Sequence, residues 1–319
     1  MVELRNPVVC VVGPTASGKS TLAQHLALEL GGAVLSADSM QIYRGMDIGT
    51  GKLAAHERLV EHYGLDLVDP GQAFSAALYQ DYGRKVVMEL DAKGMPCVVC
   101  GGTGFYIRAL VDDYCFVDGS QVGNEVRDRY VRMASAEGPE AVWDVLKRLD
   151  PESAELIPKA DVKRVVRALE MHDQGVSYAR QKEQLSKIPA YFPAVFVGLA
   201  VDRDELVCAI DERVDRMLEA GLVDEVRGLL DRGFRDALTA QAAIGYKEVV
   251  AYLDGRCSLE EAAESIKLAT RRYAKRQRTW FGHDARVNWL ECHVPASEDE
   301  FGVLLERALG LVKLGGAHG

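Results

Sequence analysis

The chain of 319 residues carries 38 lysine and arginine residues against 48 aspartate and glutamate residues, a formal net charge of −10 at pH 7. This acidic balance argues against a surface that binds nucleic acid indiscriminately, although it leaves room for a local basic patch. A hydrophobic content of 48% is typical of a soluble globular protein, and we find neither a signal peptide nor an apolar run of roughly 18 residues, so we expect a cytoplasmic protein that contacts no membrane.

The first predicted element is a buried strand at 7–13, "PVVCVVG", which leads into a helical pattern, "KSTLAQHLALEL". Between them "GPTASGKS" fits G-x-x-x-x-G-K-[ST], a loop whose backbone N–H groups and helix N-terminus hold phosphate groups. In this interpretation Lys19 reaches the terminal phosphate and the Ser20 hydroxyl binds Mg²⁺. The alternative is an ordinary strand-to-helix turn. The residues predicted to hold phosphate are Gly13, Pro14, Thr15, Ala16, Ser17, Gly18, Lys19 and Ser20.

A second buried strand, predicted at 32–38, ends in Asp38. Ligands of open α/β sheets bind beyond the carboxyl ends of the strands, so we expect Gly13, Asp38 and Gly101 to meet around one site. Asp38 could then accept a proton from a nucleophile that attacks beside the bound phosphate. The alternative, of equal weight on sequence alone, is a helix N-cap, a common use of Asp-Ser.

The third predicted strand, 96–102, continues into "GGTG" at 101–104, where glycines allow close approach of the backbone to a ligand and Thr103 offers a hydroxyl. The alternative is a plain strand-to-helix turn. A phosphate-loop ATPase needs a second, metal-binding aspartate after such a strand, so its absence weakens an ATPase interpretation. Cys97 and Cys100 face opposite sides of a strand and are interpreted as core; an odd count of seven cysteines is typical of a reducing cytoplasm.

The strand–helix alternation breaks between about 114 and 193, where the pattern is helical and prolines punctuate it. It resumes with strands predicted at 194–202 and 286–291. Continuous Val-rich runs suit strands buried on both faces of a parallel sheet, so the alternation predicts an α/β doubly wound fold. We therefore predict a discontinuous core domain, 1–113 and 194–314, with an all-helical insertion domain at 114–193 and a flexible tail at 315–319.

A helix predicted at 258–281 begins with a capping box and carries a basic face. At 100° per residue, the core face holds Ala262, Ile266, Ala269, Tyr273 and Trp280. The opposite face holds Lys267, Arg271, Lys275 and Arg278, with Arg272 and Arg276 at its flank. Because the helix has almost no acidic residues after Glu264, pairing within the helix cannot neutralise this face, which favours contact with a polyanion over a solvated surface. Lys163, Arg164 and Arg167 form a second basic cluster.

Six motifs together resemble the bacterial tRNA dimethylallyltransferase family. They are, in order over roughly residues 7 to 291, "GPTASGKS", "SADSMQIYRGMDIGTGK", "GGTGFYIRAL", "DVKRVVRALE", "AAIGYKE" and "TRRYAKRQRTWF". The resemblance implies a P-loop NTPase-like parallel core with a helical insertion. It further implies transfer of the dimethylallyl group of dimethylallyl diphosphate to N6 of adenosine 37 in tRNAs that read codons beginning with U. The phosphate loop would then hold the departing diphosphate.

Carried over residue by residue, the resemblance assigns the reacting groups. Lys19 neutralises the diphosphate, Ser20 binds the cofactor Mg²⁺, Asp38 is the general base, Thr103 lies at the channel between donor and adenine, and Arg213 contacts the diphosphate. The insertion domain is expected to contact tRNA, with the anticodon stem-loop as partner and a monomeric enzyme. The implied tRNA-binding residues are Asp38, Ser39, Met40, Gln41, Arg127, Lys163, Arg164, Val165, Val166, Arg167, Gly245, Tyr246, Lys247, Arg271, Lys275, Arg276 and Arg278, the last three within Lys275 through Gly282.

Three positions hold a residue that differs from the usual one in the family, and none of these differences removes a reacting group. Ser20 stands where most members have Thr, Gly51 where Ala is common, and Phe105 where Leu is frequent. Three other functions stay open on sequence. One is an isopentenyltransferase that acts on free adenine nucleotides, which would not need the basic helix; the second is a phosphate-loop small-molecule kinase; the third, disfavoured by the phosphate loop, is a non-catalytic RNA-binding module.

Overall fold

The structure, a computed structural model, describes residues 1–116, 124–184, 188–237 and 239–316. The chain divides into two compact units, a core unit of Met1–Asp112 with Ala190–Gly319 and a helical unit of Asp113–Pro189. The sequence placed the corresponding boundaries at 113/114 and 193/194.

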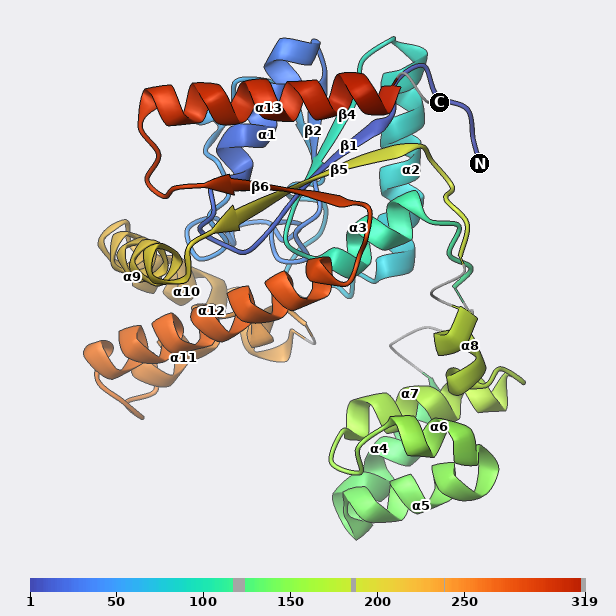
Figure 1. Cartoon of the computed structure of the whole chain (residues 1–319). Coiled ribbons are helices and arrows are strands. Elements are labelled where there is room, and N and C mark those ends of the chain that lie inside the picture. The colour runs from blue at the N-terminus through green and yellow to red at the C-terminus, as the bar shows by residue number, and fades with distance from the viewer. Residues whose placement is uncertain (117–123, 185–187, 238, 317–319) are drawn as a thin grey trace. The chain divides into compact units, whose positions relative to one another are not determined.

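A six-stranded parallel sheet forms the centre of the core unit, in the order β3-β2-β4-β1-β5-β6 (Figure 1). The five predicted strands are confirmed. A sixth, edge strand was missed because two residues are too short for a periodic pattern. The strands are β1 (Val8–Val12), β2 (Ala33–Ser36), β3 (His62–Tyr63), β4 (Cys97–Cys100), β5 (Ala194–Val201) and β6 (Val287–Cys292).

Helices cover both faces of this sheet, as the doubly wound prediction requires (Figure 1). On one face α1 (Lys19–Leu30) and α13 (Glu298–Gly316) pack over Val9 and Val11 of β1. On the other, α2 (Ala76–Ala92) and α3 (Gly104–Val111) pack over Cys10 and Val12. Side chains of β1 thus alternate between two cores, which is why its sequence is a continuous apolar run. This arrangement is P-loop NTPase-like, with the phosphate loop between β1 and α1.

The C-terminal helix and the cysteines refine two predictions. The predicted tail begins too early, because α13 extends to Gly316 and Gly315 lies directly against Val195 of β5; residues 317–319 lie outside the described part of the chain. Cys97 packs in one core and Cys100 in the other, both as free thiols, so the core interpretation is confirmed. Among the described residues, no helix is both long and apolar enough to cross a membrane.

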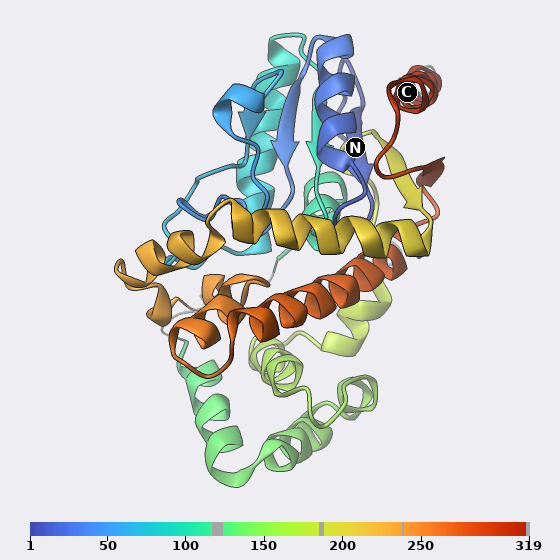
Figure 2. The same ribbon diagram turned by 90° about the vertical axis from the view of Figure 1, so that its left-hand side faces the viewer.

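Four further helices pack at the carboxyl ends of the strands, where α9 and α12 run side by side (Figure 2). Their apolar faces enclose a third core that also takes in Ile42, Tyr43 and Met46 from the segment after β2. The helices are α9 (Arg203–Glu219), α10 (Leu222–Leu230), α11 (Tyr246–Leu253) and α12 (Leu259–Gly282). Short 3₁₀ turns, η1 (Ala55–Glu57), η3 (Phe234–Asp236) and η4 (Ala240–Ala242), connect the segments.

The buried face of α12 differs from the predicted one in its second half. The capping box between Ser258 and Glu261 is present, and Ala262 and Ile266 are buried as predicted. Trp280, however, is 46% exposed, and Gln277 and Phe281 are buried instead. The neighbours of α12 change along its length, from α9 and α11 to α3 and the sheet, so one fixed stripe cannot describe the whole helix.

The described part of the helical unit contains five helices and no strand, as predicted. Pro139 and Pro151 occupy first-turn positions, where a missing N–H costs nothing, and Asp150 and Asp161 cap the following helices. The helices are α4 (Glu125–Glu137), α5 (Pro139–Leu149), α6 (Pro151–Leu156), α7 (Val162–Asp173) and α8 (Tyr178–Gln184). They enclose their own apolar core, centred on Val142, Leu146, Val165 and Leu169.

Candidate active site

The loop between β1 and α1 has the backbone shape that a phosphate site requires. Gly13 and Gly18 have positive φ angles of 142° and 81°, and a side chain on Gly13 would meet the Leu199 carbonyl at 3.0 Å. Because Gly18 has no side chain to cap α1, the first N–H groups of this helix remain available to an anion. The buried Ser17 hydroxyl has no hydrogen-bond partner among the described residues, which leaves another donor inside the loop.

Lys19 folds back across this loop, where its ammonium group donates to the Pro14 carbonyl. The pKa of Lys19 is lowered to about 8, mainly by burial and also by Arg213, while Cys100 and Asp38 oppose the shift. A cation that loses hydration in this way gains most when an anion takes the place of water. The position therefore suits a ligand with concentrated negative charge.

Two adjoining cavities lie beyond the carboxyl ends of β1, β2 and β4. The first, of about 80 Å³, is lined by Lys19, Ser20, Asp38, Gly101, Gly102, Arg213 and Gln277 among others. The second, of about 270 Å³, has several apolar residues in its lining, among them Met40, Val214, Met217, Ile244 and Ile266. Asp38 and Arg213 line both, so a polar compartment beside the phosphate loop opens into a more apolar one. Of the three residues expected to meet here, Asp38 and Gly101 line the first cavity, whereas Gly13 does not, and the phosphate loop reaches it through Thr15, Lys19 and Ser20 instead.

Asp38 projects from the turn that follows β2. Its Oδ1 accepts a hydrogen bond from the Met40 amide at 2.9 Å, and its Oδ2 has no hydrogen-bond partner among the residues that the structure describes. No helix begins here, so the N-cap alternative is wrong. One oxygen thus fixes the carboxylate while the other remains available to a reacting group.

The "GGTG" segment joins the Asp38 turn to α12. Thr103 Oγ1 accepts from the Ser39 amide at 3.0 Å and contacts the Ser39 hydroxyl at 3.3 Å. Gln277, buried on α12, donates from Nε2 to the Gly102 carbonyl at 3.1 Å and accepts at Oε1 from the Thr15 amide at 2.8 Å. Gln277 is a site residue that was not predicted from the sequence. The sequence pattern that could have indicated it is a polar side chain one turn after Tyr273, on the apolar face of an amphipathic helix.

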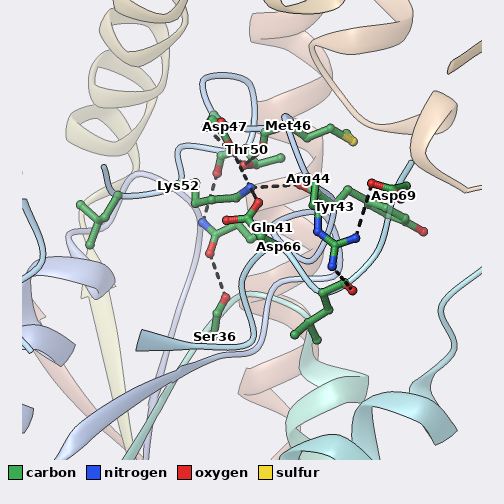
Figure 3. Close-up of polar contacts among 12 residues, drawn as sticks. Ser36, Gln41, Tyr43, Arg44, Met46, Asp47, Thr50, Lys52, Asp66 and Asp69 are labelled. Atoms are coloured by element: carbon green, nitrogen blue, oxygen red, sulfur yellow. Dashed lines mark hydrogen bonds and ion pairs between the residues drawn. The ribbon is translucent and has the colours of Figure 1, made fainter. Parts of the chain in front are cut away.

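Loop 46–52, which carries "GTGK", contributes residues to the lining of both cavities. Figure 3 shows its polar contacts. The buried ammonium group of Lys52 binds Asp47 and Asp66, at 2.6 Å each, and donates to the Tyr43 carbonyl at 3.0 Å. Gln41 accepts from the Ser36 hydroxyl at 2.8 Å and donates to the Thr50 and Gly51 carbonyls at 3.3 and 3.4 Å. These contacts fix the loop against the end of β2.

Arg213 reaches this loop from α9. Its Nη2 donates to the Thr50 carbonyl at 3.3 Å, and burial is the main cause that lowers its pKa, with Asp38 opposing. A Cβ on Gly51 would stand 2.2 Å from the same nitrogen, so Gly51, with φ of 62°, leaves room for the guanidinium. The departure from Ala at this position therefore lets Arg213 lie against the loop backbone in this chain.

The structure corrects three of the predicted tRNA-binding residues. Val165, Val166 and Tyr246 are almost completely buried, so their side chains cannot touch a macromolecule. Gln41 is half-buried and lines the first cavity, and its role toward tRNA stays a prediction. The motifs that contain these three residues also contain exposed ones, among them Lys163 and Lys247. Family motifs record residues that build a surface together with residues that touch the ligand.

Other predicted tRNA-binding residues line the second cavity or are at least partly exposed. Ser39, Met40 and Gly245 line the second cavity, and Lys247 is exposed beside Glu248. In the helical unit, Arg127 and Arg167 both bind the buried Glu170, while Lys163 and Arg164 are exposed and Arg164 pairs with Asp161. Their roles toward tRNA stay predictions.

The basic face of α12 is partly neutralised by α9. Lys267 pairs with Asp215 at 2.8 Å, and Arg271 Nε donates to Asp211 at 2.9 Å. The sequence excluded pairing within the helix, but acidic residues of another helix supply it. Lys275, Arg276 and Arg278 remain exposed and have no ion pair with a residue that the structure describes. The cationic surface is thus confined to the second half of α12.

A family model described as IPP transferase matches residues 41–284, and a second, described as isopentenyl transferase, matches residues 6–63. Similar curated proteins named tRNA dimethylallyltransferase include one from Bacillus pumilus, 38% identical over 98% of this chain and 99% of the relative, and one from Geobacillus thermodenitrificans, 43% identical over 94% of each. A solved full-length tRNA isopentenylpyrophosphate transferase from Bacillus halodurans matches with a TM-score of 0.71 at 37% identity over 97% and 98% of the two chains. A eukaryotic dimethylallyltransferase solved while acting on tRNA matches with a TM-score of 0.76 at 27% identity, over 89% of this chain and 73% of the other.

Proposed function

The chain belongs to the IPP transferase family, and on this premise we propose that it is a tRNA dimethylallyltransferase. Its reaction transfers the dimethylallyl group of dimethylallyl diphosphate to N6 of adenosine 37 in tRNAs that read codons beginning with U, and releases diphosphate. One observation supports this chemistry above all. A phosphate loop, a cation at Arg213 and a carboxylate with an uncommitted oxygen at Asp38 line a single small cavity.

The proposed transfer forms a bond between adenine N6 and C1 of the dimethylallyl group while the bond from C1 to the diphosphate oxygen breaks. The lone pair of N6 is delocalised into the adenine ring, so a proton bound to N6 becomes acidic only as the new bond forms. The Asp38 carboxylate takes that proton. Lys19, Arg213 and the N–H groups of the loop neutralise the charge that develops on the leaving diphosphate.

A magnesium ion fits the oxygen groups at this site. Mg²⁺ prefers oxygen ligands and keeps several waters, so it is commonly held by one or two protein oxygens and the phosphates of a substrate. Ser20 places its hydroxyl on the lining of the first cavity, and no cluster of three or more His, Cys, Asp or Glu residues occurs in the described ranges. We propose that Ser20 would hold the ion together with diphosphate oxygens, where it would supply charge neutralisation.

The direct test is transfer of labelled dimethylallyl diphosphate to unmodified tRNA that carries A36 and A37, with Mg²⁺ present. Labelled tRNA, with no label when A37 is replaced by G, is the expected result. Absence of transfer by a folded protein that binds the donor would overturn the proposal. A solvent-exposed basic surface on α12 motivates tRNA, rather than a small molecule, as the acceptor.

A second candidate has the same prenyl donor and a free adenine nucleotide as acceptor. The match of residues 6–63 to the isopentenyl transferase model agrees with prenyl transfer and names no acceptor. A comparison of AMP with tRNA as acceptor separates the two, because transfer to AMP at a rate similar to that with tRNA would favour the nucleotide. A kinase activity is tested in the same series by γ-phosphate transfer from ATP.

A further inference from the structure

Glu225 on α10 binds the backbone of loop 46–52 with both of its carboxylate oxygens. Oε2 accepts from the amides of Asp47 and Ile48 at 2.9 and 2.7 Å, and Oε1 accepts from the amide of Gly49 at 3.2 Å. The Tyr246 hydroxyl also donates to Oε1, at 2.6 Å, so the carboxylate accepts four hydrogen bonds in all. Three consecutive amides of one loop are therefore fixed by a side chain that lies far away in the sequence.

Tyr246 completes this arrangement from the other side. It is fully buried, and a Cβ on Gly49 would stand 2.5 and 2.7 Å from two atoms of its ring and 2.8 Å from its hydroxyl oxygen. The first glycine of "GTGK" thus admits the Tyr246 ring, and the second admits the Arg213 guanidinium. Burial and the adjacent Glu225 raise the pKa of Tyr246 well above its usual value, so the hydroxyl remains a donor.

The next residues of the same loop contact the reacting groups of the site. The Thr50 carbonyl accepts from Arg213, and the Thr50 and Gly51 carbonyls accept from Gln41. A shift of the amides at 47–49 would move these carbonyls, because they belong to one short turn in which the Gly51 amide bonds to the Ile48 carbonyl at 3.0 Å.

We propose that Glu225, with Tyr246, is a positioning residue that fixes loop 46–52 and thereby aims Arg213 at the diphosphate of the donor. Glu225 does not touch the substrate; it acts through the Thr50 carbonyl. The inference rests on the proposed function for the identity of the donor. Its physical content, a coupling between Glu225 and the binding of a diphosphate by Arg213, does not depend on the acceptor.

The variant Glu225→Gln tests this coupling because both carboxylate oxygens accept hydrogen bonds. An amide nitrogen cannot accept, so either orientation of the glutamine sets an N–H₂ group against donors. We expect the affinity for inorganic diphosphate and kcat/KM for the donor to fall by about tenfold, and the Kd for tRNA to stay unchanged. Tyr246→Phe keeps the ring against Gly49 and removes only the hydroxyl, so a fall of about threefold is expected.

A double-mutant cycle with Arg213→Lys separates positioning from a general structural effect. If Glu225 acts through Arg213, then Glu225→Gln costs less than about twofold in the Arg213→Lys background. An equal loss in both backgrounds would overturn the proposal, as would an unchanged diphosphate affinity in a folded Glu225→Gln protein. Should that variant fail to fold, Tyr246→Phe carries the same cycle.

Asp224→Asn is the matched control. It removes a carboxylate from the same first turn of α10, but Asp224 pairs only with Arg227 among the described residues, so diphosphate affinity and kcat/KM should be unchanged. A similar loss in this control would assign the effect to the charge of the helix and contradict the proposal. Diphosphate binding is measured without tRNA, so a failure of the proposed function, seen as no transfer by the wild-type protein, is distinguishable from a failure of this inference.

Discussion

Gln277 Oε1 accepts a hydrogen bond from the amide of Thr15 at 2.8 Å, so the helix that carries the basic surface also holds the phosphate loop. The other end of the same side chain donates to Gly102, and a Cβ on Gly102 would stand only 1.9 Å from that nitrogen. The loops after β1 and β4 are therefore fixed to α12 by one amide.

Gln277→Glu is expected to break one of these two hydrogen bonds and keep the other. An ionised carboxylate still accepts from Thr15 but cannot donate to Gly102, whereas Gln277→Leu removes both hydrogen bonds and leaves the Thr15 N–H and the buried Gly102 carbonyl unpaired. We expect Gln277→Leu to lower the free energy of unfolding by about 1–3 kcal/mol. Gln277→Glu should lower it at least as much, because a charge would be buried against the Gly102 carbonyl, and both variants should lower kcat. Urea unfolding and single-turnover kinetics provide the measurements. Equal stability of wild type and Gln277→Leu would contradict this account.

Asp38→Asn is expected to lower the rate of transfer about 10²- to 10⁴-fold, which is the usual contribution of a general base. The amide oxygen can still accept from Met40, so the turn keeps its shape and the affinity for tRNA should change little. The measurement is single-turnover transfer beside tRNA binding by filter retention. Transfer at the wild-type rate would remove Asp38 from the chemistry.

The titration of Lys19 should make kcat/KM for the donor depend on pH. Its pKa of about 8 in the free enzyme lies below its ordinary value of 10.5, so the ammonium group is charged at pH 7 and loses its proton as the pH rises through 8. The neutral amine attracts diphosphate less, so log kcat/KM for the donor should fall above about pH 8 with a slope approaching −1. In Lys19→Arg the guanidinium stays protonated and this fall should disappear. A fall at the same pH in the arginine variant would assign the titration to another group.

The basic residues of α12 should separate into two classes by their effect on salt dependence. Lys275→Ala with Arg278→Ala removes two exposed cations and should reduce the slope of log Kobs against log[salt] by about 0.7–0.9 for each phosphate that is no longer neutralised. Lys267→Ala removes a cation that is already paired with Asp215, so the slope should change little. An unchanged slope in the double variant would show that these two side chains are solvated and do not contact phosphates of tRNA.

Gly101→Ala tests the close approach of β4 to the Asp38 turn. A Cβ at Gly101 would stand 2.2 Å from the Ala37 carbonyl, and backbone cannot give way as a flexible side chain can. We expect a loss of about 1–3 kcal/mol or more in the free energy of unfolding and a large loss of transfer activity. The matched control is Gly71→Ala, because nothing lies within 4 Å of a Cβ there. A comparable loss in the control would show that the assay reports glycine replacement in general.

Much of the fold could be predicted from local patterns. Five strands were found because a strand buried on both faces must be apolar throughout, and the phosphate loop was found because its glycines and Lys19 stand between a strand and a helix. The capping box at Ser258 is a similar local signal. Edge strand β3 was missed because two residues, half-buried, leave no periodic signal.

The sequence by itself determined the residue types at the carboxyl ends of the strands, and so the presence of a phosphate site with a carboxylate beside it. Only the tertiary structure decided which charges of α12 are exposed, since the partners of Lys267 and Arg271 come from α9. Tertiary structure also decided that Glu225 holds loop 46–52 and that Tyr246 is buried. The physical reason is that local patterns record propensity and periodicity, whereas a hydrogen bond between residues far apart in the sequence exists only once the chain has packed.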